Sequence, residues 1–196
     1  MIVSEPRLPD WNAPLAVARH LEATPKSAVT RGLFIQDVVE AMREHGVRDT
    51  RTETDYIGFK HYPMNVYLER LHEAAQVIHA NKPVRSGIRL LGQRVFRNFS
   101  STLAGKAIFA VANLEFRKVA KLATVAYSTV YSPGHIEVES LGTGHLLVQL
   151  RDVWAFASCL QVGIWEGSME MCRSPGEIKI VEHSLCDVDF DITWSE

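Results

Sequence analysis

The sequence predicts an α+β fold, in which an N-terminal layer of helices packs on a C-terminal antiparallel sheet of about five strands. Apolar residues recur every three or four positions through the first two thirds of the chain, as in amphipathic helices. In the last third they alternate with polar residues, as in strands that bury one face. The chain has 196 residues, of which 46% are hydrophobic and 22% charged, which fits one globular domain.

The expected organisation is an extended arm over residues 1–14, followed by a single α+β domain over residues 15–196. The arm contains three prolines, which disfavour both helix and strand. The polar, charge-mixed stretch of residues 46–62 predicts a long surface loop. The chain opens with no basic segment followed by an apolar one, and its longest apolar run is far shorter than the ~20 residues of a spanning helix. With an odd number of cysteines as well, we expect a cytoplasmic protein.

Five helices are expected in the first layer, each marked by an apolar stripe and by a residue typical of a helix end. Proline suits the first helical position, and threonine or serine hydroxyls cap free amide groups. The clearest stripe runs from Met64 to Ile78. The expected helices are residues 15–23 before Pro25, a helix behind Thr30 that ends at Gly46, residues 63–78 from Pro63, a helix from Pro83 through Arg97, and one behind Ser101 or Thr102.

Five strands and one more helix are expected in the last third. Asp152 is the expected cap of that helix, which runs to about residue 172 between the third and fourth strands. The Asp187-x-Asp189-x-Asp191 pattern fits the wet face of the last strand better than a calcium loop, because Ile192 stands where such a loop needs glycine. The expected strands are residues 125–131, 136–139, 146–150, 178–180 and 188–194, with Pro-Gly or Gly-x-Gly turns between several of them.

Short motifs in a characteristic order indicate a family resemblance. They are Thr30-Arg31-Gly32-Leu33-Phe34, Tyr62-Pro63 with Tyr67 and Ala74-Ala75, Leu91-Gly92-Gln93-Arg94, Phe99 through Thr102 to Gly105, Gly163-Ile164-Trp165-Glu166-Gly167, and Ile192-Thr193-Trp194. Over about residues 28–195 the chain resembles a paralogous family of short, uncharacterised proteins expanded in myxobacteria. That family has no established activity that the resemblance would imply here.

The order of elements is also similar, more distantly, to vinyl-4-reductase domains, subunits of the TRAPP vesicle-tethering complex and heme–nitric oxide/oxygen-binding domains. This resemblance implies an apolar pocket or channel between helices and sheet that takes a small molecule or lipid. It is a likeness of fold, which by itself assigns no chemistry.

The Gly163-Ile164-Trp165-Glu166-Gly167 segment supplies the candidate pocket residues. Gly163 and Gly167 are four positions apart and share a helix face, which we expect to lie against the sheet. Trp165 then points elsewhere, and Trp165 and Trp154 are the expected aromatic wall of a pocket. Glu166 is an acid–base candidate if it faces inward and a surface charge if it faces outward.

A basic helix face is the second candidate site. Residues 82–121 hold nine basic residues and one acidic residue, a net charge of +8, whereas residues 136–196 hold eleven acidic and three basic residues, a net charge of −8. Either the basic face binds an anion or acidic partner, or the two halves attract each other. Nucleic acid is not expected, because the nearby aromatic residues have core-like spacing. The face is Arg85, Arg89, Arg94 and Arg97.

No cofactor, metal or catalytic residue is expected. The Tyr-x-Ser-x-Arg motif of the heme-binding branch does not occur, and His72 and His79 suit surface or cap positions. A Gly-x-Ser-x-Gly elbow and a phosphate-binding loop are also missing from the sequence. Whether a metal binds among Cys159, Cys172, Cys186 and His183 stays open, since at most three of them suit a site that needs four ligands.

The expected function is a non-enzymatic ligand-binding or regulatory module with an apolar pocket. Its expected partners are an apolar small molecule or lipid and a second copy of the chain or another protein. Gly87, Gly92 and Gly105 interrupt helices, which favours close helix packing, within the core or across a dimer interface. The alternative is an enzyme or cofactor-binding protein that acts on an apolar small molecule.

Overall fold

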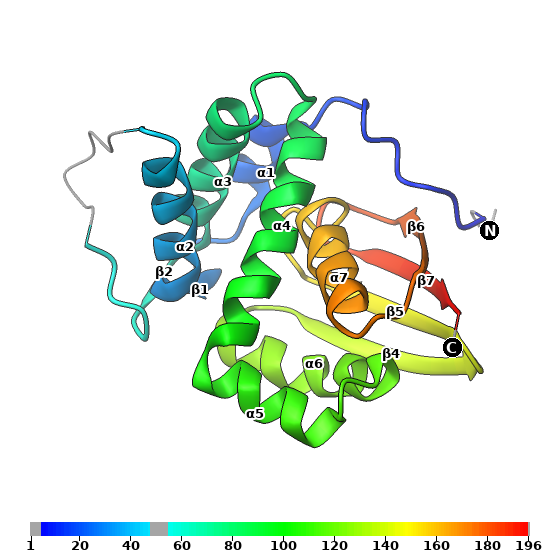
Figure 1. Cartoon of the computed structure of the whole chain (residues 1–196). Helices are drawn as coiled ribbons and strands as arrows, with labels where there is room; N and C mark the ends of the chain where they lie inside the picture. Colours follow the sequence, from blue (N-terminus) through cyan, green and yellow to red (C-terminus); the bar gives the residue numbers. More distant parts are fainter. Residues whose placement is uncertain (1–4, 48–54, 196) are drawn as a thin grey trace.

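The computed structural model describes residues 5–47 and 55–195, apart from the side chains of Ala104 and Ile108. Its elements confirm the α+β class, with helices first and an antiparallel sheet last (Figure 1). The first half holds α1 (Val17–Ala23), β1 (Val29–Arg31), α2 (Gly32–Glu44), β2 (His61–Pro63), α3 (Met64–Ile78), α4 (Val84–Ser101) and α5 (Leu103–Ala112). The second half holds α6 (Phe116–Val130), β3 (Tyr131–Ser132), β4 (His135–Gly142), β5 (His145–Arg151), α7 (Leu160–Met171), β6 (Gly176–Glu182) and β7 (Val188–Trp194).

The main sheet has four antiparallel strands in the order β4-β5-β7-β6. Val148 pairs with Phe190, and Phe190 pairs with Ile180, so one apolar row crosses three strands. The expected alternation in β7 is confirmed, because Val188, Phe190 and Ile192 are fully buried while the residues between them are not. Helices cover the buried face, with α7 in front of the sheet and α6 beside β4 (Figure 1).

The expected first strand, residues 125–131, is wrong. These residues form the last turns of α6, and only Tyr131 and Ser132 are extended, as β3 of a small second sheet with the order β2-β1-β3. The helix buries Phe116, Val119, Ala120 and Tyr127, which recur at helical and not at strand spacing. The main sheet therefore has four strands, and α7 lies between its second and third strands in chain order.

Two expected helix starts are also wrong, and a third is confirmed. Thr30 is not a cap: it is fully buried in β1, where it pairs with Tyr62 and Tyr131. Asp152 does not begin a helix either, because turns separate it from α7 and its backbone amide donates to a carboxylate oxygen of Asp187. The Thr102 hydroxyl does cap α5, accepting a hydrogen bond from the amide of Gly105 at 3.1 Å.

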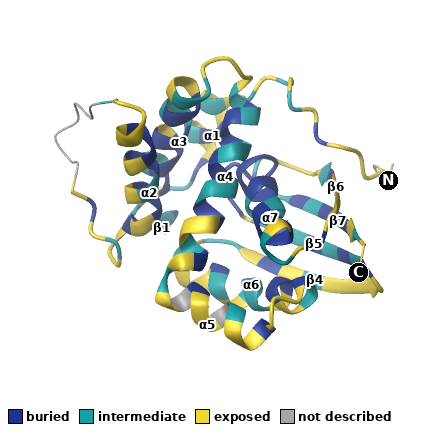
Figure 2. Cartoon of the chain, viewed as in Figure 1, coloured by how far each residue is buried: buried dark blue, intermediate teal, exposed yellow. Residues whose placement is uncertain are grey.

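Helices α4 and α7 cross at very close range. A Cβ atom on Gly163 would overlap the carbonyl oxygen of Arg89, and one on Gly92 would overlap the carbonyl oxygen of Leu160. A Cβ atom on Gly167 would lie 3.2 Å from the carbonyl oxygen of Gln93. The glycines of α7 therefore face α4, and the expectation that they face the sheet is wrong. Figure 2 shows that α7 is buried along most of its length.

The described part of the arm, residues 5–14, runs along the outer strand β6. Arg7 exchanges two backbone hydrogen bonds with Ile180, and the ring of Trp11 lies under the guanidinium of Arg89. The arm therefore covers an edge at which β6 has no other strand neighbour among the described residues.

Of the expected loop over residues 46–62, residues 48–54 lie outside the described residues, and the final two belong to β2.

Candidate functional site

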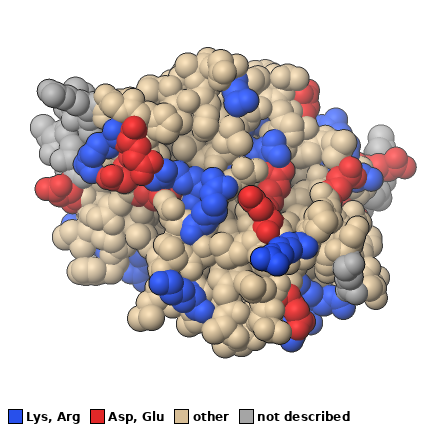
Figure 3. Space-filling model, viewed as in Figure 1, with Lys and Arg blue, Asp and Glu red and all other residues tan. Residues whose placement is uncertain are grey.

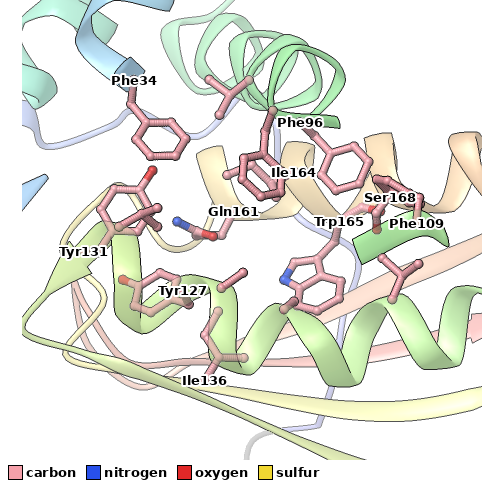
Figure 4. Close-up of a pocket in the computed structure, with 16 residues that line it drawn as sticks. Phe34, Phe96, Phe109, Tyr127, Tyr131, Ile136, Gln161, Ile164, Trp165 and Ser168 are labelled. Atoms are coloured by element: carbon pink, nitrogen blue, oxygen red, sulfur yellow. The ribbon is translucent and has the colours of Figure 1, made fainter. Parts of the chain in front are cut away.

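An apolar pocket lies between α4, α6 and α7, close to the start of β4 (Figure 4). Its volume is about 100 Å³. All the described lining residues are uncharged, and most are aromatic or aliphatic. They are Phe34, Val95, Phe96, Phe99, Phe109, Val119, Ala123, Ala126, Tyr127, Val130, Tyr131, Ile136, Gln161, Ile164, Trp165 and Ser168.

The pocket is the space left between α6 and the packed pair of helices α4 and α7, because the side chains of α6 do not fill it completely. The side of α6 that faces the pocket carries small residues, Ala123 and Ala126, between the larger Val119 and Tyr127. Ala126 and the neighbouring Val130 are half-buried, as is Phe99 across from them on α4. This side is where the pocket approaches solvent.

Four buried polar atoms that border the pocket have no hydrogen-bond partner among the described residues; one is the hydroxyl of Tyr131, and the other three come from α6 and α7. These three are the hydroxyl of Tyr127, Nε2 of Gln161 and the indole Nε1 of Trp165. Their residues are 5%, 2% and 3% exposed. Figure 4 shows the Gln161 amide between Tyr131 and Trp165. A buried donor without a partner is unfavourable by about 1–3 kcal/mol, so these atoms favour a bound acceptor at this place, either a water molecule or a polar group of a ligand.

A cluster of aromatic rings closes one end of the pocket. The ring of Tyr131 stacks on Phe34 at a centroid distance of 5.4 Å and lies 4.9 Å from the ring of Tyr127. Burial raises the pKa of Tyr131, Tyr127 and their neighbour Tyr67 above the ordinary value of a phenol. All three hydroxyls are therefore protonated at neutral pH and can donate hydrogen bonds.

Of the five pocket candidates named from the sequence, Trp165 is the one that lines the pocket. Trp154 is half-buried against the core and is not among the lining residues. Glu166 points toward α4, where its carboxylate accepts hydrogen bonds from Arg89 at 2.6 and 2.7 Å and from Gln93 at 3.0 Å. It therefore does not face the pocket as an acid or base. Gly163 and Gly167 contribute the close α4–α7 crossing.

The four arginines of the basic face all have acidic partners within the chain. Arg85 pairs with Glu182 of β6 at 2.9 Å, and Arg89 pairs with Glu166. The other two pairs are Arg94 with Asp37 and Glu44, and Arg97 with Glu170 at 3.7 Å. Basic and acidic side chains accordingly lie side by side in the middle of this face (Figure 3). The pairs of Arg85, Arg89 and Arg97 fit mutual attraction between residues 82–121 and residues 136–196, whereas Arg94 pairs with acidic residues of α2.

A wider, more polar groove lies between α2 and α4, with a volume of about 710 Å³. Asp37 forms part of its wall, accepts a hydrogen bond from Asn98 and forms an ion pair with Arg94 at 3.4 Å. Burial raises the pKa of Asp37, while Asn98 and Arg94 act in the opposite direction. Phe34, Val95 and Phe99 border both this groove and the apolar pocket, so a single layer of side chains separates the two spaces.

The cysteines and His183 do not gather into one site. Among the described residues, the group that could offer three metal ligands is Asp152, Cys186 and Asp187, which excludes Cys159, Cys172 and His183. Burial raises the pKa of Cys159 to about 12 and that of Cys172 to about 11, so both thiols are protonated at neutral pH. Nε2 of His183 instead contacts Asp189 at 2.8 Å.

Sequence reasoning missed most of the pocket. Tyr127 and Tyr131 were assigned to a strand, and Gln161 carried no signal as a single polar residue at the start of an apolar helix. Phe34 stands out in the sequence only as part of the Thr30-Arg31-Gly32-Leu33-Phe34 motif. The helical spacing from Phe116 to Tyr127 is the one signal that would have placed Tyr127 beside α7.

Helices long and apolar enough to cross a bilayer are not found in the described part of the chain. A family model described as "Protein of unknown function (DUF2378)" matches residues 23–195. None of the curated proteins matches the sequence.

The fold is similar to solved H-NOX structures. A crystal structure of an H-NOX protein from S. oneidensis in the Fe(II)NO ligation state has 13% identity and a TM-score of 0.62, and the match covers 85% of this chain and 99% of that one. For Fe(II) unliganded H-NOX protein from K. algicida the identity is 14%, the TM-score 0.60 and the coverage 85% and 97%. A structure solved to study heme redox potential and porphyrin distortion has 12% identity, a TM-score of 0.62 and coverage of 84% and 93%. At such identities the likeness concerns the fold.

Proposed function

The chain belongs to the DUF2378 family of proteins of unknown function, and we propose that it is a small-molecule-binding module with a regulatory role. The observation that carries this proposal is the uncharged, largely apolar pocket between α4, α6 and α7. Pockets of this kind, with apolar walls and a few polar atoms, are typical of ligand sites. The H-NOX structures, described with Fe(II) and with Fe(II)NO ligation, add a fold-level analogy with ligand-binding proteins.

The size of the pocket indicates a compact ligand. An engineered apolar cavity of about 150 Å³ holds benzene, whereas drug-sized ligands occupy about 300–1,000 Å³. A volume of about 100 Å³, in a pocket that approaches solvent on one side, therefore suits a single ring with a small substituent. A lipid chain would need the pocket to open, so of the two ligand classes implied by the wider resemblance we propose the small molecule.

The pocket residues do not fit heme. Heme iron is held by His, Cys, Met or Tyr. The described lining has none of the first three, and burial keeps the hydroxyls of Tyr127 and Tyr131 protonated. Lys and Arg, which would pair with the heme carboxylates, are also missing from the described lining. His72 and His79 belong to α3 and its C-terminal end and do not border the pocket.

Binding is a better proposal than catalysis on an apolar substrate. A general acid or base needs a pKa near the working pH. The titratable groups of the described lining are the two buried tyrosines, whose pKa values are raised. Carboxylate, imidazole, amine and thiol groups do not occur among the lining residues that are described.

Binding of an apolar probe tests the proposal. α-Methylstyrene, added to the full chain and followed by NMR, should shift the methyl signals of Val95, Ile136 and Ile164. Ala126→Phe places a ring at the half-buried side of the pocket and should weaken binding at least tenfold. Ser128→Phe, at an exposed position on the same helix outside the lining, is the matched control and should bind as the parent does. Equal binding by the Ala126→Phe variant, or no binding by the parent, would overturn the proposal.

The proposed module is a homodimer. Large apolar side chains are exposed on α5 and α6, with Leu103 88%, Val111 74% and Val125 66% exposed (Figure 2). Large exposed apolar side chains on two helices that contact each other favour a contact site. The glycines that first suggested a dimer do not contribute, because Gly87, Gly92 and Gly105 each meet another part of the same chain.

The three cysteines are free, which fits the cytoplasm that we propose as the location of the protein.

Sedimentation at micromolar concentration tests the dimer. We expect a species of twice 22.0 kDa that becomes a monomer when Val111→Glu is introduced. A parent that sediments only as a monomer would overturn this part of the proposal without affecting the pocket.

A further inference from the structure

Three hydrogen-bond donors converge on the pocket from two helices. Gln161 and Trp165 are four residues apart on α7 and share one face of that helix. Tyr127 reaches the same space from α6. Figure 4 shows these three side chains around one cavity. Their polar atoms, Gln161 Nε2, Trp165 Nε1 and the Tyr127 hydroxyl, are buried without a partner among the described residues.

Each of these atoms is able to donate a hydrogen bond to a ligand. An indole nitrogen can only donate, and the amide nitrogen of glutamine also donates. The Tyr127 hydroxyl is protonated because burial raises its pKa. The one other hydroxyl on the lining part of α7, that of Ser168, already donates to the carbonyl oxygen of Trp165 at 2.7 Å. The pocket therefore presents donors, and a complementary ligand presents an acceptor.

The ligand must also be uncharged. An ion in an apolar pocket needs a partner of opposite charge, and the described lining offers none. The four arginines of the neighbouring helix α4 lie outside the lining, and each already pairs with an acidic side chain. A carboxylate or phosphate is thus a poor match, although hydrogen-bond donors face the cavity.

We propose that the pocket selects a neutral, compact, largely apolar molecule that carries a carbonyl-type oxygen, such as an aromatic ketone or ester. The oxygen accepts from the donors of α7 and Tyr127, and the apolar body lies against Phe96, Ile136 and Ile164. This inference rests on the proposed function, because it names the ligand class of the same pocket.

Two probes of similar shape measure how much a carbonyl oxygen on the ligand contributes to binding. Acetophenone and α-methylstyrene have nearly the same size and the same connectivity of heavy atoms, and they differ in a carbonyl oxygen in place of a methylene group. Calorimetric titration of the full chain should give about tenfold tighter binding of acetophenone. Benzoate, with the same ring and a negative charge, should bind more weakly than both. The three probes together separate acceptor, shape and charge.

Substitutions in the pocket test which side chains donate hydrogen bonds to the carbonyl oxygen of acetophenone. Trp165→Phe and Tyr127→Phe each remove a polar atom and keep a ring. Each should bring acetophenone binding toward that of α-methylstyrene and leave α-methylstyrene binding within about twofold. Trp154→Phe is the control, because Trp154 Nε1 is also buried without a partner but lies outside the lining. In the parent, acetophenone should move the indole proton signal of Trp165 downfield and leave that of Trp154 in place.

The possible outcomes distinguish a failure of this inference from a failure of the proposed function. If α-methylstyrene binds as tightly as acetophenone, the selection for an acceptor is wrong and the apolar pocket remains. If benzoate binds most tightly, the ligand is an anion and the inference is also wrong. If no probe binds, the proposed function fails together with it. Unchanged indole signals during acetophenone binding would mean that water satisfies the donors, and would equally overturn the inference.

Discussion

Arg89 serves two neighbours with one guanidinium group. It donates two hydrogen bonds to Glu166, and its carbon lies 4.6 Å from the ring centre of Trp11. A planar, delocalised cation can do both, which a lysine in its place could not. The sequence placed this arginine on a basic face. Its two partners, the carboxylate of Glu166 and the ring of Trp11, come from α7 and from the arm, and no local sequence pattern links these segments to α4.

Removing the Glu166 carboxylate should destabilise the fold. Glu166→Ala leaves Arg89 half-buried without its partner, and we expect the free energy of unfolding to fall by about 1–2 kcal/mol. Glu170→Ala is the matched control on the same helix, since Glu170 is exposed and lies 3.7 Å from Arg97. Urea unfolding at neutral pH measures both variants. Equal losses would show that the Arg89–Glu166 geometry adds nothing.

His20 should make the protein less stable in mild acid. It is 4% exposed, and burial lowers its pKa below the ordinary histidine value of 6.5, with Arg85 acting in the same direction. Between the folded and unfolded pKa values the unfolded chain binds more protons, so the free energy of unfolding falls as the pH drops through this window. An NMR titration of the His20 ring should give a pKa below 6.5. A value at or above 6.5 would contradict the expectation.

Helix α6 is the element that the sequence analysis misread. Val125, Tyr127, Thr129 and Tyr131 alternate and have β-branched or aromatic side chains, which favours a strand. The tertiary structure overrides this preference, because Phe116, Val119 and Ala120 bury a helical stripe that continues to Tyr127. The stripe of α3 and the alternation of β7 were clear because nearly all of their apolar residues are buried in one core. A pocket between helices leaves its wall partly unburied, and this weakens the pattern.

The α4–α7 crossing should tolerate no side chain at Gly163. Gly163→Val puts three carbon atoms against the Arg89 carbonyl, and we expect a loss of about 3 kcal/mol or more from overpacking. Gly142→Val is the control, because a Cβ atom there would meet nothing within 4 Å. Thermal and urea unfolding report both. A Gly163→Val variant as stable as the Gly142→Val variant would mean that the helices move apart at little cost.

The molecule as a whole is held together by contacts between distant segments. Arg85 of α4 bonds Glu182 of β6, and Arg117 of α6 donates to the carbonyl of Gly142 at the end of β4. The opposite charges of the two segments, +8 and −8 in the sequence, meet in the structure as the ion pairs of Arg85, Arg89 and Arg97 of α4 with Glu182, Glu166 and Glu170. Their pairing could not be derived from sequence, because it depends on how the layers are stacked.

Deleting residues 1–14 should expose the β6 edge. The deletion removes the backbone pair between Arg7 and Ile180 and the Trp11 ring over Arg89. We expect a loss of roughly 1–3 kcal/mol and concentration-dependent aggregation, because an uncovered edge strand pairs with other chains. Trp11→Ala in the full chain should lose stability but stay monodisperse, since the arm still covers the edge. Light scattering compares the two, and a deletion variant that remains monodisperse would contradict the prediction.

The three-way contact at Arg89 also has an evolutionary consequence. Trp11, Arg89 and Glu166 come from segments separated by more than seventy residues each, yet a change at one of them leaves the other two in an unsuitable environment. Members of the family that have lost the arginine should therefore have replaced the glutamate and the tryptophan as well, and members that keep it should keep both. Counting these joint replacements across family sequences would show whether natural selection has treated the three positions as one unit.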